Sequence, residues 1–139
     1  MFNFRFETLL KIRKTHEDKA KQFYAERLKT HQDELNFKMN LELQLKKCYS
    51  ERTQLDRFFL SEERILFLKQ ALVKQNERIA YSQGRLNEAL AQFLEVKKKK
   101  EILEKLKEKD AMKFKRDKNK KELKHLDYIY MISHKKSEL

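Results

Sequence analysis

The stretch between residues 65 and 96 decides the fold. It reads ILFLKQALVKQNERIAYSQGRLNEALAQFLEV. Steps of seven residues meet an apolar side chain every time, at Ile65, Leu72, Ile79, Leu86 and Phe93. A second series, three residues further on, is apolar at four of its six positions: Leu68, Gln75, Ser82, Ala89, Val96 and Leu103. This heptad pattern is typical of a coiled coil, so it predicts a long helix that packs on another helix.

The composition agrees with long helices. The 139 residues contain no Pro and only one Gly, Gly84, whereas 40% of them are charged. Compact β and α/β domains use Gly and Pro in their many turns, so the composition excludes barrels, sandwiches and Rossmann-type folds. It also excludes the glycine-rich loops that bind phosphate groups.

The first half of the chain carries a less regular pattern. Two groups of residues each fit a heptad register: first Phe6, Leu10, Ala20 and Tyr24, and then Leu41, Leu45, Cys48, Leu55 and Phe59. Polar residues stand at seam positions between the groups: Arg13, Glu17, Arg27 and His31. We expect one long helix here, with a seam that is partly polar and drifts in register.

The break between the helices is expected between Ser50 and Ser61. Ser61 precedes two glutamates, which suits a helix N-terminus. The prediction is an all-α fold: two long helices forming an antiparallel coiled-coil hairpin, as a single coiled-coil domain over residues 1–139. Helix one spans about 3–55, the turn region about 50–61 and helix two about 62–135. Antiparallel pairing places Phe6 beside about residue 108, so that the longer second helix overhangs at its C-terminal end.

The charge is strongly positive and unevenly distributed. The net charge is +12, and residues 97–139 carry 16 basic against 8 acidic side chains. Basic proteins tend to meet nucleic acid, anionic membranes or acidic protein surfaces. No apolar run reaches the length of a signal peptide or a membrane span, so we expect a cytoplasmic protein without membrane insertion.

A search for catalytic chemistry finds no site. The four histidines, His16, His31, His125 and His134, include no pair at helical metal-binding spacing. The lone Cys48 excludes an internal disulfide and suits a small buried seam position. We expect no enzyme, no catalytic residue, no metal and no cofactor. The ten Phe and five Tyr are many for a coiled coil, so some of them are expected to anchor a protein partner.

Three segments resemble the flagellar export protein FliJ family. The opening Phe4-Arg5-Phe6-Glu7-Thr8-Leu9-Leu10-Lys11-Ile12-Arg13 has the pattern F-x-F-x-x-L-L-x-x-R. Residues 67–75 look like the start of that family's second helix. Residues 98–127 look like its C-terminal helix, except that Leu126-Asp127-Tyr128 stands where the family often has L-D-E.

The resemblance implies a stalk-like coiled coil of the type III export ATPase complex, at the cytoplasmic face of the inner membrane. Its partners would be the hexameric export ATPase, whose assembly and activity it promotes, the cytoplasmic domain of the membrane export gate, and export chaperones. Related stalk proteins serve virulence-type secretion systems, so that alternative remains open. On this basis the ATPase contact is expected at the termini, at Phe4, Phe6, Leu9, Arg13, Lys113, Arg116 and Lys120. The export-gate contact is expected near the turn, at Leu45, Tyr49, Phe59, Phe67 and Leu68.

Two other classes of function remain open from the residues alone. One is an unrelated basic coiled-coil scaffold, which would self-associate through its heptad face. The other is a nucleic-acid-binding helical protein, whose affinity would fall steeply with salt. The neutral segment 61–96 and the high acid content argue against nucleic acid, so no nucleic-acid partner is expected.

Overall fold

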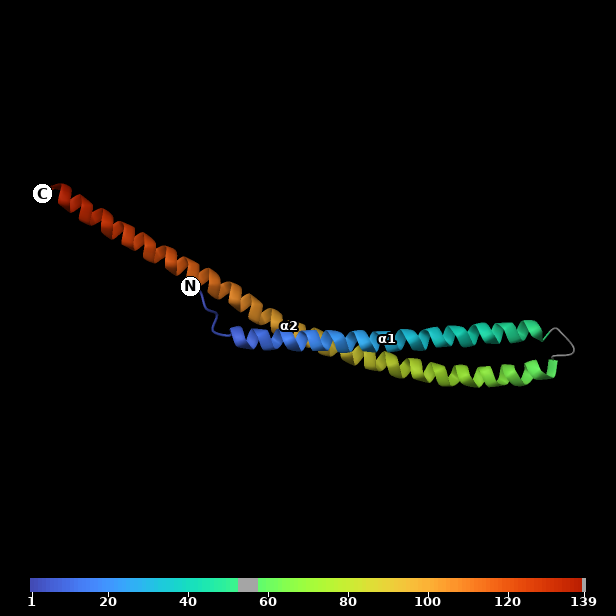
Figure 1. Cartoon of the computed structure of the whole chain (residues 1–139). Coiled ribbons are helices and arrows are strands. Elements are labelled where there is room, and N and C mark those ends of the chain that lie inside the picture. Colours follow the sequence, from blue (N-terminus) through green and yellow to red (C-terminus); the bar gives the residue numbers. More distant parts are fainter. Residues whose placement is uncertain (53–57, 139) are drawn as a thin grey trace. The chain divides into compact units, whose positions relative to one another are not determined.

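The protein consists of two long helices that pack antiparallel. The computed structural model describes the backbone of residues 1–52 and 58–138, and the side chains of residues 1–52 and 60–135. Helix α1 spans Glu7–Glu51 and helix α2 spans Phe58–Glu138 (Figure 1). No strand occurs in the part of the chain that is described. The predicted fold class is therefore confirmed, with the second helix the longer.

The helix boundaries differ from the predicted ones by a few residues. Helix α1 begins at Glu7 rather than near residue 3. Residues 1–4 have no regular secondary structure, residues 5–6 form a turn, and the Phe4 side chain is buried. Helix α2 begins at Phe58, so Ser61 lies inside the helix with its side chain buried. The expectation that Ser61 caps this helix is therefore wrong, although the break does fall between Ser50 and Ser61.

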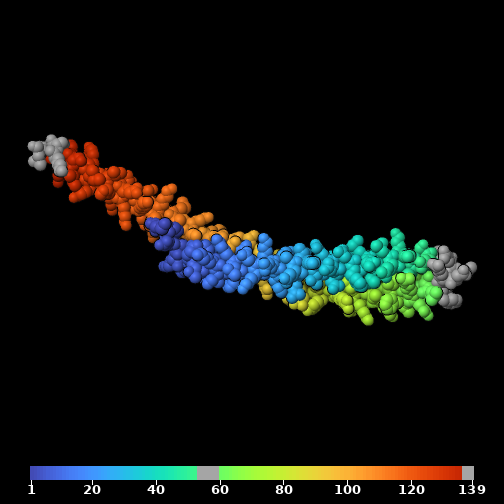
Figure 2. Space-filling view, viewed as in Figure 1, coloured from blue at the N-terminus to red at the C-terminus, as the bar shows by residue number. Residues whose placement is uncertain are grey.

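Contacts divide the chain into two compact units. The terminal unit comprises Met1–His16 and Lys97–Leu139, and the loop-side unit comprises Glu17–Val96. Both helices run through both units. Within the loop-side unit, α1 and α2 lie side by side, with their side chains in contact (Figure 2).

The heptad pattern of α2 is confirmed by burial. Every member of the two series between Ile65 and Leu103 is buried or half-buried. In α1, the seam is one unbroken 3.5-residue stripe from Leu10 to Cys48, so the expected register drift is wrong. Polar residues simply occupy stripe positions: Arg13, Glu17, Arg27, His31, Glu34 and Lys38. Long polar side chains can do this because their apolar stems cover the seam while their heads reach water.

The apolar core of the loop-side unit lies toward the chain reversal. Leu41 and Cys48 of α1 form a buried cluster with Ile65 and Leu68 of α2. Leu45, Ala71 and Leu72 pack against this cluster. The expectation that Cys48 acts as a buried apolar residue is confirmed, because only 2% of it is exposed.

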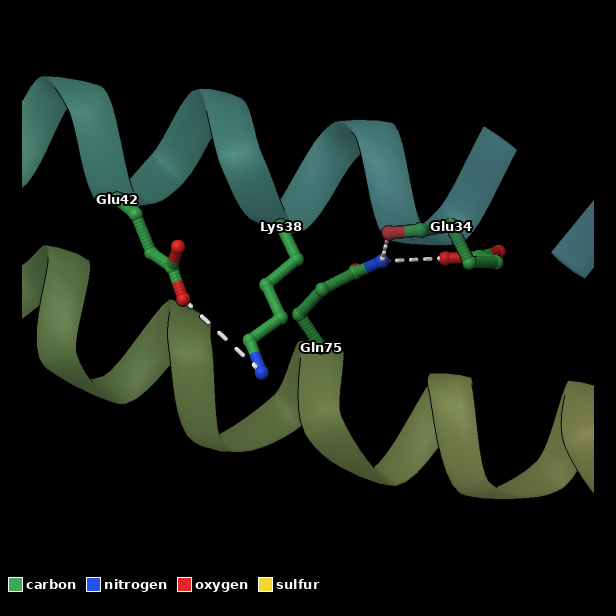
Figure 3. Close-up of polar contacts among 4 residues, drawn as sticks. All are labelled: Glu34, Lys38, Glu42 and Gln75. Carbon is green, nitrogen blue, oxygen red and sulfur yellow. Dashed lines mark hydrogen bonds and ion pairs between the residues drawn. The ribbon is translucent and has the colours of Figure 1, made fainter. Parts of the chain in front are cut away.

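Two polar layers lie at Gln75 and Ser82, the two positions of α2 at which the heptad pattern has a polar residue. The buried Gln75 donates through Nε2 to the backbone oxygen of Glu34 at 2.8 Å and to Oε2 of the same residue at 2.5 Å. Figure 3 shows Gln75 reaching across from α2 to α1, where Lys38 pairs with Glu42. The second layer joins His31 Nδ1 and Ser82 Oγ at 2.7 Å. Buried polar pairs of this kind fix the register of a coiled coil.

The terminal unit pairs the start of α1 with the middle of α2. Glu7 and Lys107 form an ion pair at 2.9 Å, which agrees with the predicted alignment of Phe6 with residue 108. Phe2 packs on Phe114 with ring centroids 5.6 Å apart, and Leu10 is almost fully buried. Every side chain from residue 112 to residue 135 is exposed, as expected for the C-terminal part of a longer second helix.

A substitution at Gly84 tests whether anything packs against this part of α2. It lies in the middle of α2 without a positive φ, and a Cβ built on it meets no atom within 4 Å. We therefore expect Gly84→Ala to raise the free energy of unfolding by about 0.5–1 kcal/mol, since Ala loses less backbone entropy in a helix. Urea denaturation followed by circular dichroism checks this. A destabilised variant would mean that another surface approaches the helix at this point.

Candidate interaction surfaces

The two units differ strongly in net charge. The terminal unit carries 20 basic and 9 acidic side chains, a net charge of +11, whereas the loop-side unit carries 14 and 13, a net charge of +1. Nearly all of the excess charge therefore lies in one compact unit. A surface of this kind attracts an acidic partner over a distance of about 10 Å at ordinary salt.

The seven residues predicted to contact the ATPase all lie in the terminal unit. Of the apolar ones, Leu9 is 37% exposed, whereas Phe4 is only 7% exposed and packs edge-on against Phe6 at 5.8 Å. The Arg5 guanidinium lies 4.5 Å from the centre of the Phe6 ring. Phe4 is thus a packing residue rather than an accessible contact, because the chain ahead of α1 folds its ring into the unit.

The basic members of this set lie on the exposed part of α2. Lys113, Arg116 and Lys120 line a shallow hollow of about 430 Å³, which they share with Lys109, Asp110 and Asp117. Arg13 lies on α1 and is half-buried at a seam position. The side chains around the hollow form a mixed but mainly cationic surface, which does not include Arg13. Such a surface suits weak, multiple contacts better than a single tight one.

The ion pair in the same unit perturbs a carboxyl group. A hydrogen bond from Lys107, together with the charges of Lys107, Lys11 and Lys14, holds the pKa of Glu7 below its ordinary value of 4.5. Glu7 is therefore ionised at any physiological pH. It ties the first turn of α1 to α2 and complements the positive N-terminus of its helix.

The residues predicted to contact the export gate divide into two groups. Tyr49 and Phe67 are 40% and 69% exposed, so they are accessible. Leu68 is 3% exposed and Leu45 packs on the apolar cluster, so neither is available to a partner. Their heptad positions already marked them as seam residues. The side chain of Phe59 lies outside the residues described.

Further exposed apolar residues adjoin Phe67. Leu66 and Val73 lie on the same helix and are about as exposed as Phe67, at 59% and 61%. Sequence reasoning missed both as contact candidates, although their positions outside the heptad seam could have identified them. Like Tyr49 and Phe67, they are apolar side chains of the loop-side unit that are accessible to a partner.

One cavity in the loop-side unit has no counterpart in the sequence-based predictions. It has a volume of about 190 Å³ and is lined by residues of both helices, including three arginines: Arg27, Thr30, Glu34, Arg78, Tyr81, Ser82 and Arg85. Arg78 and Arg85 lie seven residues apart on α2, whereas Arg27 lies on α1, more than fifty residues away in the sequence. Only the pairing of the two helices brings Arg27 to the other two arginines.

No prosthetic-group site emerges from the described side chains. Among them, no three His, Cys, Asp or Glu residues are placed to hold a metal ion. Over the same part of the chain, neither helix has a stretch apolar and long enough to span a bilayer. Comparison with protein families, with characterised proteins and with solved structures finds no match to this chain.

Proposed function

We propose that this protein is a stalk-like component of the bacterial flagellar, type III, protein export apparatus. It would bind the hexameric export ATPase and promote its assembly and activity. It would also link that ATPase to the export gate and to export chaperones. The protein would itself carry out no catalysis and need no cofactor. It would act in the cytoplasm, peripherally at the inner membrane.

The observation that carries this proposal is the composition of the terminal unit. One compact unit holds the N-terminal pattern Phe4 to Arg13 together with the basic part of α2, and it carries almost all of the net charge. These are the two segments that most resemble the FliJ family. The two-helix hairpin is also the fold that the resemblance requires.

The proposed mechanism follows from this distribution of charge. A stalk inside a ring that changes shape must hold its partner through contacts that can be exchanged. Exposed lysines and arginines make contacts that are individually weak and screened by water, but many of them together give attraction and orientation. The nearly neutral loop-side unit, with Tyr49 and Phe67 exposed, would meet the export gate.

The decisive experiment is a pull-down from native cytoplasm with the tagged protein, followed by an ATPase assay on any ring ATPase recovered. A hexameric ATPase whose turnover rises with added protein supports the proposal. Recovery of nucleic acid without an ATPase, with binding that falls steeply with salt, would indicate a nucleic-acid-binding protein instead. Self-association without either partner would indicate a scaffold.

Charge reversal tests where the ATPase binds. We expect the variant Arg13→Glu, Lys113→Glu, Arg116→Glu to abolish stimulation of the ATPase while its helicity stays unchanged. The matched control reverses three exposed charges of the loop-side unit, Lys46→Glu, Lys47→Glu and Arg64→Glu, and should retain stimulation. Full stimulation by the first variant, or equal loss in both, would contradict the assignment of the terminal unit.

A further inference from the structure

The arginine-lined cavity of the loop-side unit is the feature that neither the fold nor the proposed export role explains. Its volume of about 190 Å³ corresponds to several water molecules at about 30 Å³ each. Arg27 comes from α1, whereas Arg78 and Arg85 come from α2. Three guanidinium groups around one small cavity repel one another, so their arrangement calls for a counter-charge.

Aromatic rings hold two of the arginines in place. The Arg27 guanidinium lies 4.7 Å from the centre of the Phe23 ring, and that of Arg85 lies 5.5 Å from the centre of the Tyr81 ring. Arg85 also donates through Nη1 to the Tyr81 hydroxyl oxygen at 3.2 Å. Each helix thus presents an aromatic residue followed four positions later by a stacked arginine. Stacking of this kind orders the guanidinium groups before any ligand arrives.

The arginines outnumber the carboxylates that line the cavity. Within the described residues, none of the three forms an ion pair with an Asp or Glu side chain. The one acid that lines the cavity, Glu34, already accepts a hydrogen bond from Gln75 at 2.5 Å. The cavity is lined by three cationic side chains and one anionic side chain, so it is electropositive, although the loop-side unit as a whole is nearly neutral.

The buried hydroxyl that lines the cavity is already satisfied. Ser82 is 7% exposed, and its Oγ donates to the Ile79 carbonyl oxygen at 3.0 Å. Because that bond uses its only hydrogen, Ser82 accepts from the Nδ1–H of His31. Tyr81 accepts from Arg85, so its own hydroxyl hydrogen remains available. The cavity therefore offers a ligand guanidinium donors and one phenolic donor, and few acceptors.

We propose that this cavity binds a phosphate chain, meaning two or more linked phosphate groups that carry at least two negative charges. The fork of an arginine matches phosphate oxygens in a bidentate manner, and several such forks favour a polyvalent anion over a single carboxylate. The proposal does not depend on the export role. The same chemistry is present in free pyrophosphate and in the diphosphate chain of a nucleotide such as ADP.

Binding by the full-length protein tests the proposal. Isothermal titration calorimetry is carried out with inorganic pyrophosphate and with ADP. Saturable binding in at least one arm is expected, and the strongest arm identifies the source of the phosphate chain. Binding in no arm would overturn the proposal.

Matched variants show whether binding occurs at this cavity. Arg78→Gln is expected to weaken binding about tenfold, because it removes a charge-assisted contact. Arg64→Gln makes the same change on the same helix, outside the lining of the cavity, and should bind as the unchanged protein does. Glu34→Gln removes the only lining acid and should strengthen binding. Equal affinities for Arg78→Gln and Arg64→Gln would show that only diffuse charge attracts the anion, which would overturn the proposal.

A second readout separates a ligand site from a structural role. Without ligand, Arg78→Gln should leave the melting temperature unchanged or raise it, since it relieves repulsion among the three arginines. With the bound probe present, the unchanged protein should gain thermal stability, and the variant should gain less. Arg78 would have only a structural role if Arg78→Gln melted at a lower temperature than the unchanged protein without ligand and gained as much thermal stability from the probe as the unchanged protein does.

Discussion

Leu68→Ala is expected to lower the free energy of unfolding by about 2–5 kcal/mol, the usual range for truncating a buried leucine. Leu68 is 3% exposed and lies in the apolar cluster with Leu41, Cys48 and Ile65. A two-helix structure has no third layer that could close over a cavity, so lost contacts in this cluster are not recovered. Urea denaturation monitored by circular dichroism measures the change.

Leu66→Ala is the matched control for this prediction. It makes the same substitution on the same helix two residues earlier, but Leu66 is 59% exposed. We expect a change within about 0.5 kcal/mol, as is usual for surface positions. If the two variants lost similar stability, the heptad seam would not be the interface that holds the helices together.

Gln75→Glu is expected to destabilise the protein by about 2–4 kcal/mol at neutral pH, although it hardly changes the shape of the side chain. Gln75 is 2% exposed and donates to two oxygens of Glu34, one on the backbone and one on the carboxylate. The substitution replaces the donor by an acceptor, so both hydrogen bonds are lost. It also buries a second carboxylate against the first.

The destabilisation caused by Gln75→Glu should increase as the pH rises. Like charge and burial raise the pKa of the introduced carboxyl in the folded state above its ordinary value of about 4.3. A group with a raised folded pKa favours the fold at low pH, where it is protonated, and this contribution is lost as pH rises through the folded pKa. Gln75→Glu should therefore approach the unchanged protein in stability near pH 4 and fall behind it toward pH 7.

Two controls accompany this experiment. Gln70→Glu makes the same change at an exposed position of α2 and should have little effect at any pH. The double variant Glu34→Gln, Gln75→Glu restores the side-chain hydrogen bond in the opposite direction and removes the repulsion between two carboxylates, so it should recover part of the loss. The bond to the backbone oxygen of residue 34 is not restored. If Gln75→Glu were no worse than Gln70→Glu, the polar layer would contribute nothing to the pairing of the helices.

The two polar layers suggest how the hairpin keeps one alignment. A seam made only of leucine-like residues can slide by a heptad with little penalty. Gln75 with Glu34, and Ser82 with His31, find hydrogen-bond partners only in the observed alignment. The same alignment brings Arg27 to the cavity that Arg78 and Arg85 line. Gln75 and Ser82, the polar residues within the heptad pattern of α2, thus favour the alignment in which the three arginines line one cavity.

The sequence determined the helices and their alignment. The heptad from Ile65 to Phe93, the near absence of Gly and Pro, and the break between Ser50 and Ser61 were sufficient to predict an antiparallel pair. They also predicted that Phe6 aligns with about residue 108, which agrees with the ion pair between the neighbouring Glu7 and Lys107. These features are local, because the period of a side-chain pattern along one helix is visible without knowing what lies across from it.

Only the tertiary structure decided which side chains are accessible and which polar groups meet. The seam of α1 looked like two registers because polar residues fill half of its positions. Its continuity became visible only through burial. The path of residues 1–6 buries Phe4, whereas Leu9 lies outside the buried stripe of α1 and is exposed, although both belong to one sequence pattern. Antiparallel pairing joins positions more than fifty residues apart, and it brings Arg27 to the cavity that Arg78 and Arg85 also line. Which residues meet in this way depends on the register of the whole seam and not on any local pattern.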